Sequence, residues 1–201
     1  PLHFVQFWID VIAEWEKETG KNALIALSAT KDVQDAILND PQRSKVVDIV
    51  DVRYWHYNTN ELYAPEGGKN MAPRQHARKM KVGKVTLAEA YKAVSEYRRN
   101  YPDKAVTYYT QNYPEMAWAV FFAGGSCPAL PVKDVDLLND AAKMLTSETD
   151  GTYWQMGKNG IGCIVYSLKG GNITLNLDPG RYVLKSVNMK TGEVKVLNKN
   201  L

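Results

Sequence analysis

The chain begins with an amphipathic segment. Residues 2–19 carry apolar side chains at helical spacing, and Gly20 follows as a stop signal, which predicts a helix. We expect the apolar face of this helix to lie in the core. That face consists of Phe4, Trp8, Val11, Ile12 and Trp15.

Short apolar or β-rich runs then alternate with helical patterns. We expect strands at residues 22–29, 45–55, 105–110 and 127–132, the last weakened by two prolines. We expect helices at residues 30–38, 86–99, 114–125 and 135–145. Thr86 and Glu89 have the spacing of a capping box at the start of one of them.

Four alternations of helix and strand imply parallel connections. Such units form half of a (β/α)8 barrel or, alternatively, a small open sheet. Beyond Asp150-Gly151 the pattern changes to short strands separated by turn signals, which indicates a small antiparallel unit. We therefore expect a β/α region, either half of a barrel or an open sheet, at residues 1–147 and a small antiparallel unit at 148–201.

Composition narrows the function classes only slightly. The 201 residues are 45% hydrophobic, and the net charge of +3 is too small to indicate nucleic-acid binding. No run reaches the roughly 18 apolar residues of a membrane span. Cys127 and Cys163 match no metal motif, and we expect neither a metal nor a cofactor. A start inside a helix, without Met, is typical of a fragment.

Several segments together resemble a known family. These are "WIDVIAEWEKETGKNALIALSATKDVQDAIL", "VVDIVDVRYWHY", "LYAPEGGKNMAPRQHAR" and "WAVFFAGGS". They resemble the C-terminal half of a bacterial glycoside hydrolase-like (β/α)8 barrel, from the glycosidases of polysaccharide-degrading bacteria. The tail from Gly160 to Val194 is similar to the small β-sandwich, of the collagen-binding type, that follows such barrels. The resemblance implies an extracytoplasmic enzyme acting on a complex polysaccharide or glycan. The cations concentrated between Lys69 and Lys84 indicate an acidic sugar, because arginine pairs with carboxylates bidentately.

A long polar loop, residues 63–79, is the main candidate for a substrate site. In a barrel it would follow the second strand and lie at the rim where active sites are built. Aromatic residues near it would form a sugar platform, and polar residues in it would bind hydroxyl or carboxylate groups. The aromatic set is Trp55, His56, Tyr57 and Tyr63, and the polar set is Lys69, Asn70, Arg74, Gln75 and His76. The alternative is a solvated connector.

Catalytic carboxylates are harder to find. Glycoside hydrolysis normally uses two carboxyl groups, and the resemblance places one of them upstream of this chain. The end of the third strand, Tyr108–Thr110, carries none. Glu66 in the loop and Glu115 are the candidates, although Glu115 at a helix start is also favoured by the helix dipole. A non-catalytic carbohydrate-binding or surface protein is the alternative function.

Four more polar residues lie on or after the first two strands. Ser28 and Thr30 follow the first strand and suit substrate contact or capping, with capping expected for Thr30. Asp48 and Asp51 lie on the second strand, where caps and salt bridges compete with inward-facing carboxylates. We expect carbohydrate as ligand, and the missing N-terminal barrel half or a second copy of the chain as partner.

Overall fold

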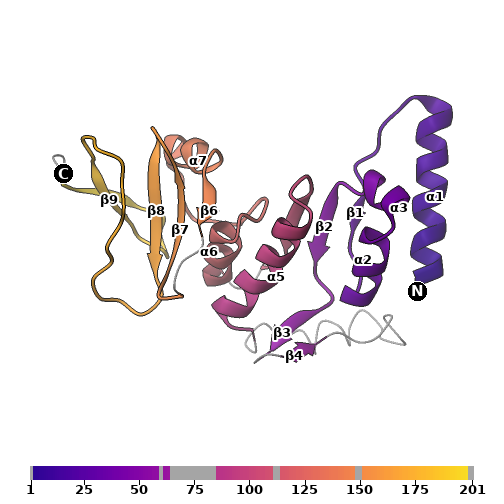
Figure 1. Ribbon diagram of the computed structural model, residues 1–201, viewed down its shortest axis with the longest axis horizontal. Helices are drawn as coiled ribbons and strands as arrows, with labels where there is room; N and C mark the ends of the chain where they lie inside the picture. The colour runs from indigo at the N-terminus through magenta and orange to yellow at the C-terminus, as the bar shows by residue number, and fades with distance from the viewer. Residues whose placement is uncertain (1, 59–60, 64–84, 111–113, 148–150, 199–201) are drawn as a thin grey trace. The chain divides into compact units, whose positions relative to one another are not determined.

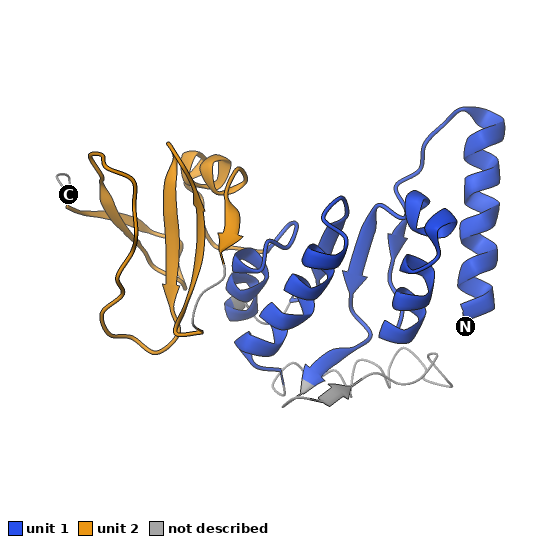
Figure 2. Ribbon diagram, viewed as in Figure 1, with its two compact units in different colours: residues 1–128 blue, residues 129–201 orange. Residues whose placement is uncertain are grey.

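The computed structural model describes residues 2–58, 61–63, 85–110, 114–147 and 151–198. The chain forms two compact units, residues 1–128 and 129–201 (Figure 2). The sequence-based boundary lay between residues 147 and 148. The structure groups α7 (Val135–Ala141) and β6 (Leu145–Ser147) with the second unit.

The first unit combines helices with a small parallel sheet (Figure 1). Its helices are α1 (Leu2–Thr19), α2 (Lys31–Leu38), α3 (Pro41–Val46), α5 (Leu87–Asn100) and α6 (Pro114–Phe122). Its strands are β1 (Ala26–Leu27), β2 (Ile49–Val52), β3 (His56–Asn58), β4 (Glu61–Tyr63) and β5 (Ala105–Tyr108). The three strands predicted at 22–29, 45–55 and 105–110 all form, though shorter than expected.

The sheet is parallel, in the order β1-β2-β5. Leu27 is aligned with Val50, and Val50 is in turn aligned with Val106. Strands β3 and β4 form a separate antiparallel pair. The parallel connections expected from alternating helices and strands are therefore confirmed.

The predicted half of a (β/α)8 barrel is wrong. The described residues form small sheets of three, three, two and two strands, none of them closed. Residues 127–132 form no strand, because Pro128 and Pro131 lack the N–H groups that a ladder needs and Cys127 has a φ of 52°. The backbone N–H of Ser126 instead donates to the carbonyl of Val106 on β5, at 2.7 Å. The open-sheet alternative describes the first unit.

Helix ends follow their local chemistry. Thr86 and Glu89 form the expected capping box at the start of α5. Thr30 occupies the N-cap position of α2, but its side chain makes no capping hydrogen bond. Beyond α6 the chain folds back so tightly that a Cβ on Gly125 would lie 2.5 Å from Cγ1 of Val120. Glycine is therefore required at this position.

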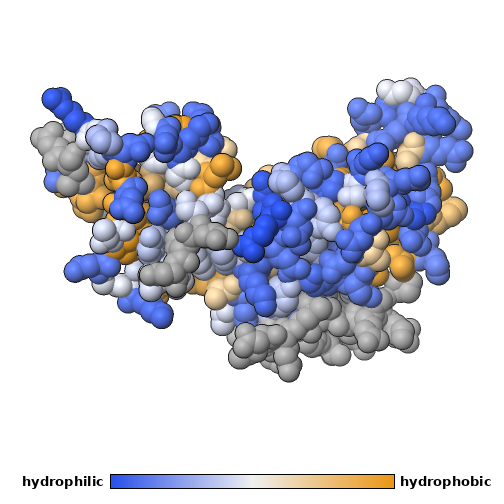
Figure 3. Space-filling view, viewed as in Figure 1, coloured by the Kyte–Doolittle hydropathy of each residue, from blue (hydrophilic) through white to orange (hydrophobic). Residues whose placement is uncertain are grey.

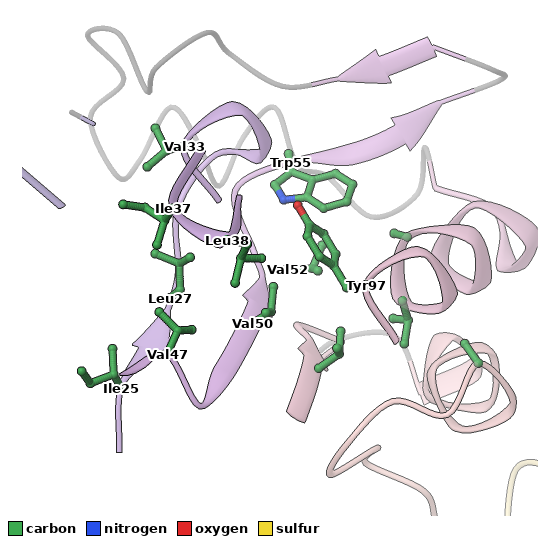
Figure 4. Close-up of a cluster of buried hydrophobic side chains, with 14 of the residues drawn as sticks. Ile25, Leu27, Val33, Ile37, Leu38, Val47, Val50, Val52, Trp55 and Tyr97 are labelled. Carbon is green, nitrogen blue, oxygen red and sulfur yellow. The ribbon is translucent and has the colours of Figure 1, made fainter. Parts of the chain in front are cut away.

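The core of the first unit lies between the sheet and its helices. Figure 4 shows side chains of α2 and of the strands meeting beside Trp55 and Tyr97. Val50, Val94 and Val106 are completely buried. On α5 the buried residues Ala90, Val94 and Tyr97 belong to the face that the sequence pattern predicts.

The first helix has the expected bounds but a different buried face. Val5, Ile9 and Ile12 face the core. Trp8 and Trp15, predicted to be core residues, are 48% and 43% exposed. Two apolar stripes run along α1, and the sequence pattern alone does not say which of them this unit buries.

The second unit is antiparallel. Strands β6, β7 (Tyr153–Lys158) and β8 (Gly162–Ser167) form one sheet, and β9 (Leu184–Val187) pairs with β10 (Val194–Asn198). The antiparallel pairing expected for the tail is present, in two small sheets. Trp154 stacks on Tyr166, with ring centroids 5.4 Å apart, so this tryptophan packs within the second unit.

Candidate functional site

One face of the parallel sheet carries polar side chains in register. Asp51 on β2 is aligned with Thr107 on β5, and Ser28 directly follows β1 on the other side of β2. Ser28 and Thr107 both donate hydrogen bonds to the Asp51 carboxylate. The three side chains therefore form a polar row across the sheet.

Asp51 is the centre of this row. Its Oδ2 accepts from Ser28 Oγ at 2.8 Å and its Oδ1 accepts from Thr107 Oγ1 at 2.9 Å. Arg53 Nε lies 3.0 Å from Oδ2. Both carboxylate oxygens are thus engaged by the chain's own donors, and Asp51 is only 9% exposed. This arrangement suits a residue that positions its neighbours.

Arg53 and Tyr109 form the accessible part of the cluster. The guanidinium carbon of Arg53 lies 5.0 Å from the centre of the Tyr109 ring, within the range of a cation–π contact. The Arg53 side chain is 47% exposed, and Tyr109 is 41% exposed. A fixed guanidinium and an aromatic ring therefore face solvent at the carboxyl ends of β2 and β5.

We call the side of the sheet with Ser28, Asp51, Arg53, Thr107 and Tyr109 the open face. The opposite, covered face carries the alternate strand residues Leu27, Val50, Val52 and Val106, which are all buried. Parallel sheets are normally buried on both sides. A parallel sheet with one polar, accessible face is therefore a candidate binding surface.

A second polar cluster lies on the helical side of the sheet, around Lys31. Its ammonium lies 2.8 Å from Asp35 Oδ2 and 2.7 Å from Glu96 Oε1, and 5.4 Å and 5.2 Å from the ring centroids of Trp55 and Tyr97. Burial works against the charged form, but hydrogen bonds and charges from the two carboxylates outweigh it and raise the pKa of Lys31. A lysine held charged in this way is a structural cation rather than a nucleophile.

Hydrogen bonds tie this cluster to the sheet. Gln34 is fully buried, and its amide donates to the carbonyls of Leu27 at 2.8 Å and Asp51 at 2.9 Å. Gln34 Oε1 accepts from Trp55 Nε1 at 2.7 Å. Gln34 thereby fastens the ends of β1 and β2 to each other and to the covered core.

Tyrosines complete the cluster. Tyr97 donates to Asp35 at 2.7 Å, and Tyr57 donates to Glu96. Burial, together with these carboxylate partners, raises the pKa of Tyr97 and of Tyr57 well above the ordinary tyrosine value. Both hydroxyls are therefore protonated donors across the neutral range.

The structure places the predicted aromatic residues away from the open face. Trp55 and His56 are buried, and Tyr57 is half-buried beneath Lys92, whose ammonium lies 4.1 Å from the ring centroid. The backbone of Tyr63 pairs with His56 in the β3–β4 pair. Trp55 and Tyr57 pack in the covered core, and with His56 buried these three residues offer little exposed ring surface to a sugar.

Most predicted polar site residues lie outside the described part of the chain. These are Glu66, Lys69, Asn70, Arg74, Gln75 and His76. Glu115 is exposed in the first turn of α6, a place that suits both a catalytic carboxylate and a partner of the helix dipole. Among the two strand aspartates, the salt bridge expected for Asp51 is present, and Asp48 Oδ2 accepts from the backbone of Ile25 at 2.8 Å.

Sequence reasoning missed Arg53 and Thr107. A signal was present in the second strand, where Asp51 and Arg53 stand two residues apart and so share one side of a strand. That spacing indicates a polar face, whereas the prediction for the strand at 45–55 named Asp48 and Asp51 but not Arg53. Thr107 required the register, which the sequence alone does not give.

The described residues contain neither a metal-binding cluster nor a membrane-spanning helix. No group of three or more His, Cys, Asp or Glu side chains is arranged to hold a metal ion. Within the same residues, no helix combines the length and apolar character needed to traverse a bilayer.

Comparison with known families gives one match. Residues 1–144 match the family model described as "Domain of unknown function (DUF6298)". The chain belongs to this family. The DUF6298 match contains the whole open face and extends through α7. No curated protein and no solved structure matches the chain.

Proposed function

We propose that the chain binds carbohydrate on the open face of the β1-β2-β5 sheet and that Arg53 recognises an acidic sugar. The pairing of Arg53 with Tyr109 carries this proposal. A guanidinium binds a carboxylate through two parallel N–H···O bonds, and an aromatic ring offers an apolar surface with a polar edge. Uronate-containing glycans present both a carboxylate and an apolar ring face.

The surroundings of Arg53 support a binding role. The Asp51 carboxylate contacts Arg53 through Nε, and 47% of the Arg53 side chain is exposed, so the guanidinium is accessible to a ligand. Ser28 and Thr107 hold Asp51 in turn. Because the arginine is fixed before a ligand arrives, less conformational entropy is lost on binding.

The proposal includes no hydrolysis by this chain alone. Glycosidases place two carboxyl groups about 5–5.5 Å or about 6.5–9.5 Å apart. On the described part of the open face Asp51 is the one carboxylate, and both of its oxygens are occupied. Hydrolysis through Glu66 or Glu115 is the competing hypothesis. Both hypotheses include a location outside the cytoplasm.

Affinity measurements on the chain test the binding proposal. Isothermal titration calorimetry would compare uronate-containing oligosaccharides with neutral ones of the same length. Loss of a charge-assisted hydrogen-bond pair costs about 1.5–3 kcal/mol, so we expect Arg53→Ala to weaken uronate binding about 10- to 100-fold. Arg181→Ala, at an exposed arginine of the second unit, is the matched control and should bind like the wild type.

Two outcomes would contradict the proposal. One is that the wild-type chain binds none of the oligosaccharides. The other is that Arg53→Ala and Arg181→Ala bind equally well. Release of reducing sugar by the wild-type chain, abolished in Glu66→Gln or Glu115→Gln, would instead establish the hydrolase hypothesis.

A further inference from the structure

The outer side of α1 is an exposed apolar stripe. Phe4, Trp8, Val11 and Trp15 are 67%, 48%, 37% and 43% exposed, and we call these four residues the α1 seam. Figure 3 shows hydrophobic residues along the outer edge of this helix. The opposite side of α1 packs on the core through Val5, Ile9 and Ile12. Contiguous exposed apolar surface of this kind marks an interaction site.

The seam has the spacing of a helix-pairing surface. Its residues are separated by four, three and four positions, which is the alternating d-a-d-a order of a heptad repeat. The rings of Phe4 and Trp8 are in contact, with centroids 6.3 Å apart. Phe7 also packs against Trp8, at 5.5 Å, and widens the stripe. An amphipathic helix is the partner that such a stripe fits.

We propose that the α1 seam pairs antiparallel with the same seam of a second copy of this chain. The separations of four, three and four residues are the same in both directions along the helix. Two copies of the seam therefore match when the helices are antiparallel. Residues whose numbers add to 19 then face each other, so that Phe4 meets Trp15 and Trp8 meets Val11. Each layer of the pair joins an a position to a d position, and the contact is two-fold symmetric.

Charges favour the antiparallel direction. The C-terminal half of α1 carries the exposed residues Glu14 and Glu18, and the first turn contains no acidic residue. An antiparallel partner places these carboxylates beside the positive end of the other helix dipole and beside His3. A parallel partner would place Glu18, which is at a d position of the same repeat, beside its own copy, where like charges repel.

Sedimentation equilibrium of the full chain tests the pairing. We expect a concentration-dependent dimer for the wild type. The dimer dissociation constant should be at least 10-fold higher for Val11→Glu than for Lys17→Glu. Lys17→Glu is the matched control, because it adds the same residue to the same helix at an exposed position away from the seam. A monomeric wild type at about 100 µM, or an unchanged dimer in Val11→Glu, would overturn the proposal.

Cysteine cross-linking tests the direction of the helix pair and does not depend on whether Val11→Glu folds. In a background with Cys127 and Cys163 changed to Ser, a mixture of Phe4→Cys and Trp15→Cys chains should form a mixed disulfide. Trp15→Cys alone should not, because its two copies would be about 16 Å apart along the helix axis and a disulfide needs Cα atoms within about 7 Å. A disulfide from Trp15→Cys alone, with no mixed product, would contradict the antiparallel arrangement.

Discussion

The two faces of the β1-β2-β5 sheet use the same three strands for different purposes. On the covered face, Leu27, Val50 and Val106 are aligned across the strands and buried beneath helices. On the open face, one residue further along each strand, Ser28, Asp51 and Thr107 are aligned in the same way but joined by hydrogen bonds. Burial of apolar area stabilises the first set, while directed polar contacts order the second.

This difference separates stability from recognition. Apolar side chains on the covered face are closely packed, so truncating one of them lowers the free energy of unfolding of the whole unit. The open face keeps its polar groups near water, where each hydrogen bond contributes only about 0.5–1.5 kcal/mol to folding. Changes on the open face are therefore expected to alter binding more than stability.

The largest expected effect compares two neighbouring residues of one strand. Leu27→Ala removes buried apolar volume, and such changes cost about 2–5 kcal/mol. Ser28→Ala removes one hydrogen bond to Asp51 and should cost about 0.5–1.5 kcal/mol. Urea unfolding of both variants measures the difference. Equal losses would mean that the open face is packed as tightly as the covered one.

A smaller effect is expected at Gln34, whose side chain donates hydrogen bonds to backbone carbonyls of β1 and β2. Gln34→Leu leaves the indole N–H of Trp55 and two backbone carbonyls without their amide partner. A buried group left unsatisfied costs about 1–3 kcal/mol. Gln42→Leu, at an exposed position, is the control and should unfold like the wild type. A double change with Trp55→Phe should be less than additive, because the unsatisfied donor is removed.

The smallest expected effect is a pH dependence of stability to which the cluster on the covered side contributes. The pKa values of Lys31, Tyr57 and Tyr97 are raised above their ordinary values of 10.5 for lysine and 10.0 for tyrosine. Groups with raised pKa values contribute stability that is complete below the unfolded-state pKa and is lost as the pH rises through the folded-state pKa. The melting temperature should therefore fall above about pH 10.

Substitution tests the origin of that fall. Tyr97→Phe removes one of the titrating hydroxyls and should make the decline above pH 10 shallower. Tyr109→Phe is the matched control on the open face, because it makes the same change at a residue that is 41% exposed. Identical alkaline profiles for the wild type and Tyr97→Phe would show that the covered cluster does not control this dependence.

Local signals predicted most of the elements but not their assembly. The capping box at Thr86 and Glu89 and the apolar face of α5 are visible in the sequence and recur in the structure. Sheet closure is not local, because it depends on partners for β1 and β5. Pro128 and Pro131 indicated from the sequence alone that the strand predicted at 127–132 was unfavourable.

The helix α1 illustrates the same limit. Its bounds follow from spacing, but an eighteen-residue helix with apolar residues on two sides does not reveal which side this unit buries. The candidate site was predicted in part: Ser28 and Asp51 were named from the first two strands, and the spacing of Arg53 from Asp51 was a signal in the sequence, while Thr107 emerged only from the register. Which side chains meet across strands is set by pairing, and pairing is a long-range property.

Footprinting by hydroxyl radicals, with and without a bound uronate oligosaccharide, tests the central claim most directly. The claim is that the open face, and not the covered one, contacts the ligand. We expect the ligand to protect Tyr109 from oxidation, with no change at Trp55 or Tyr97. Unchanged oxidation of Tyr109 in the presence of bound ligand would contradict the account.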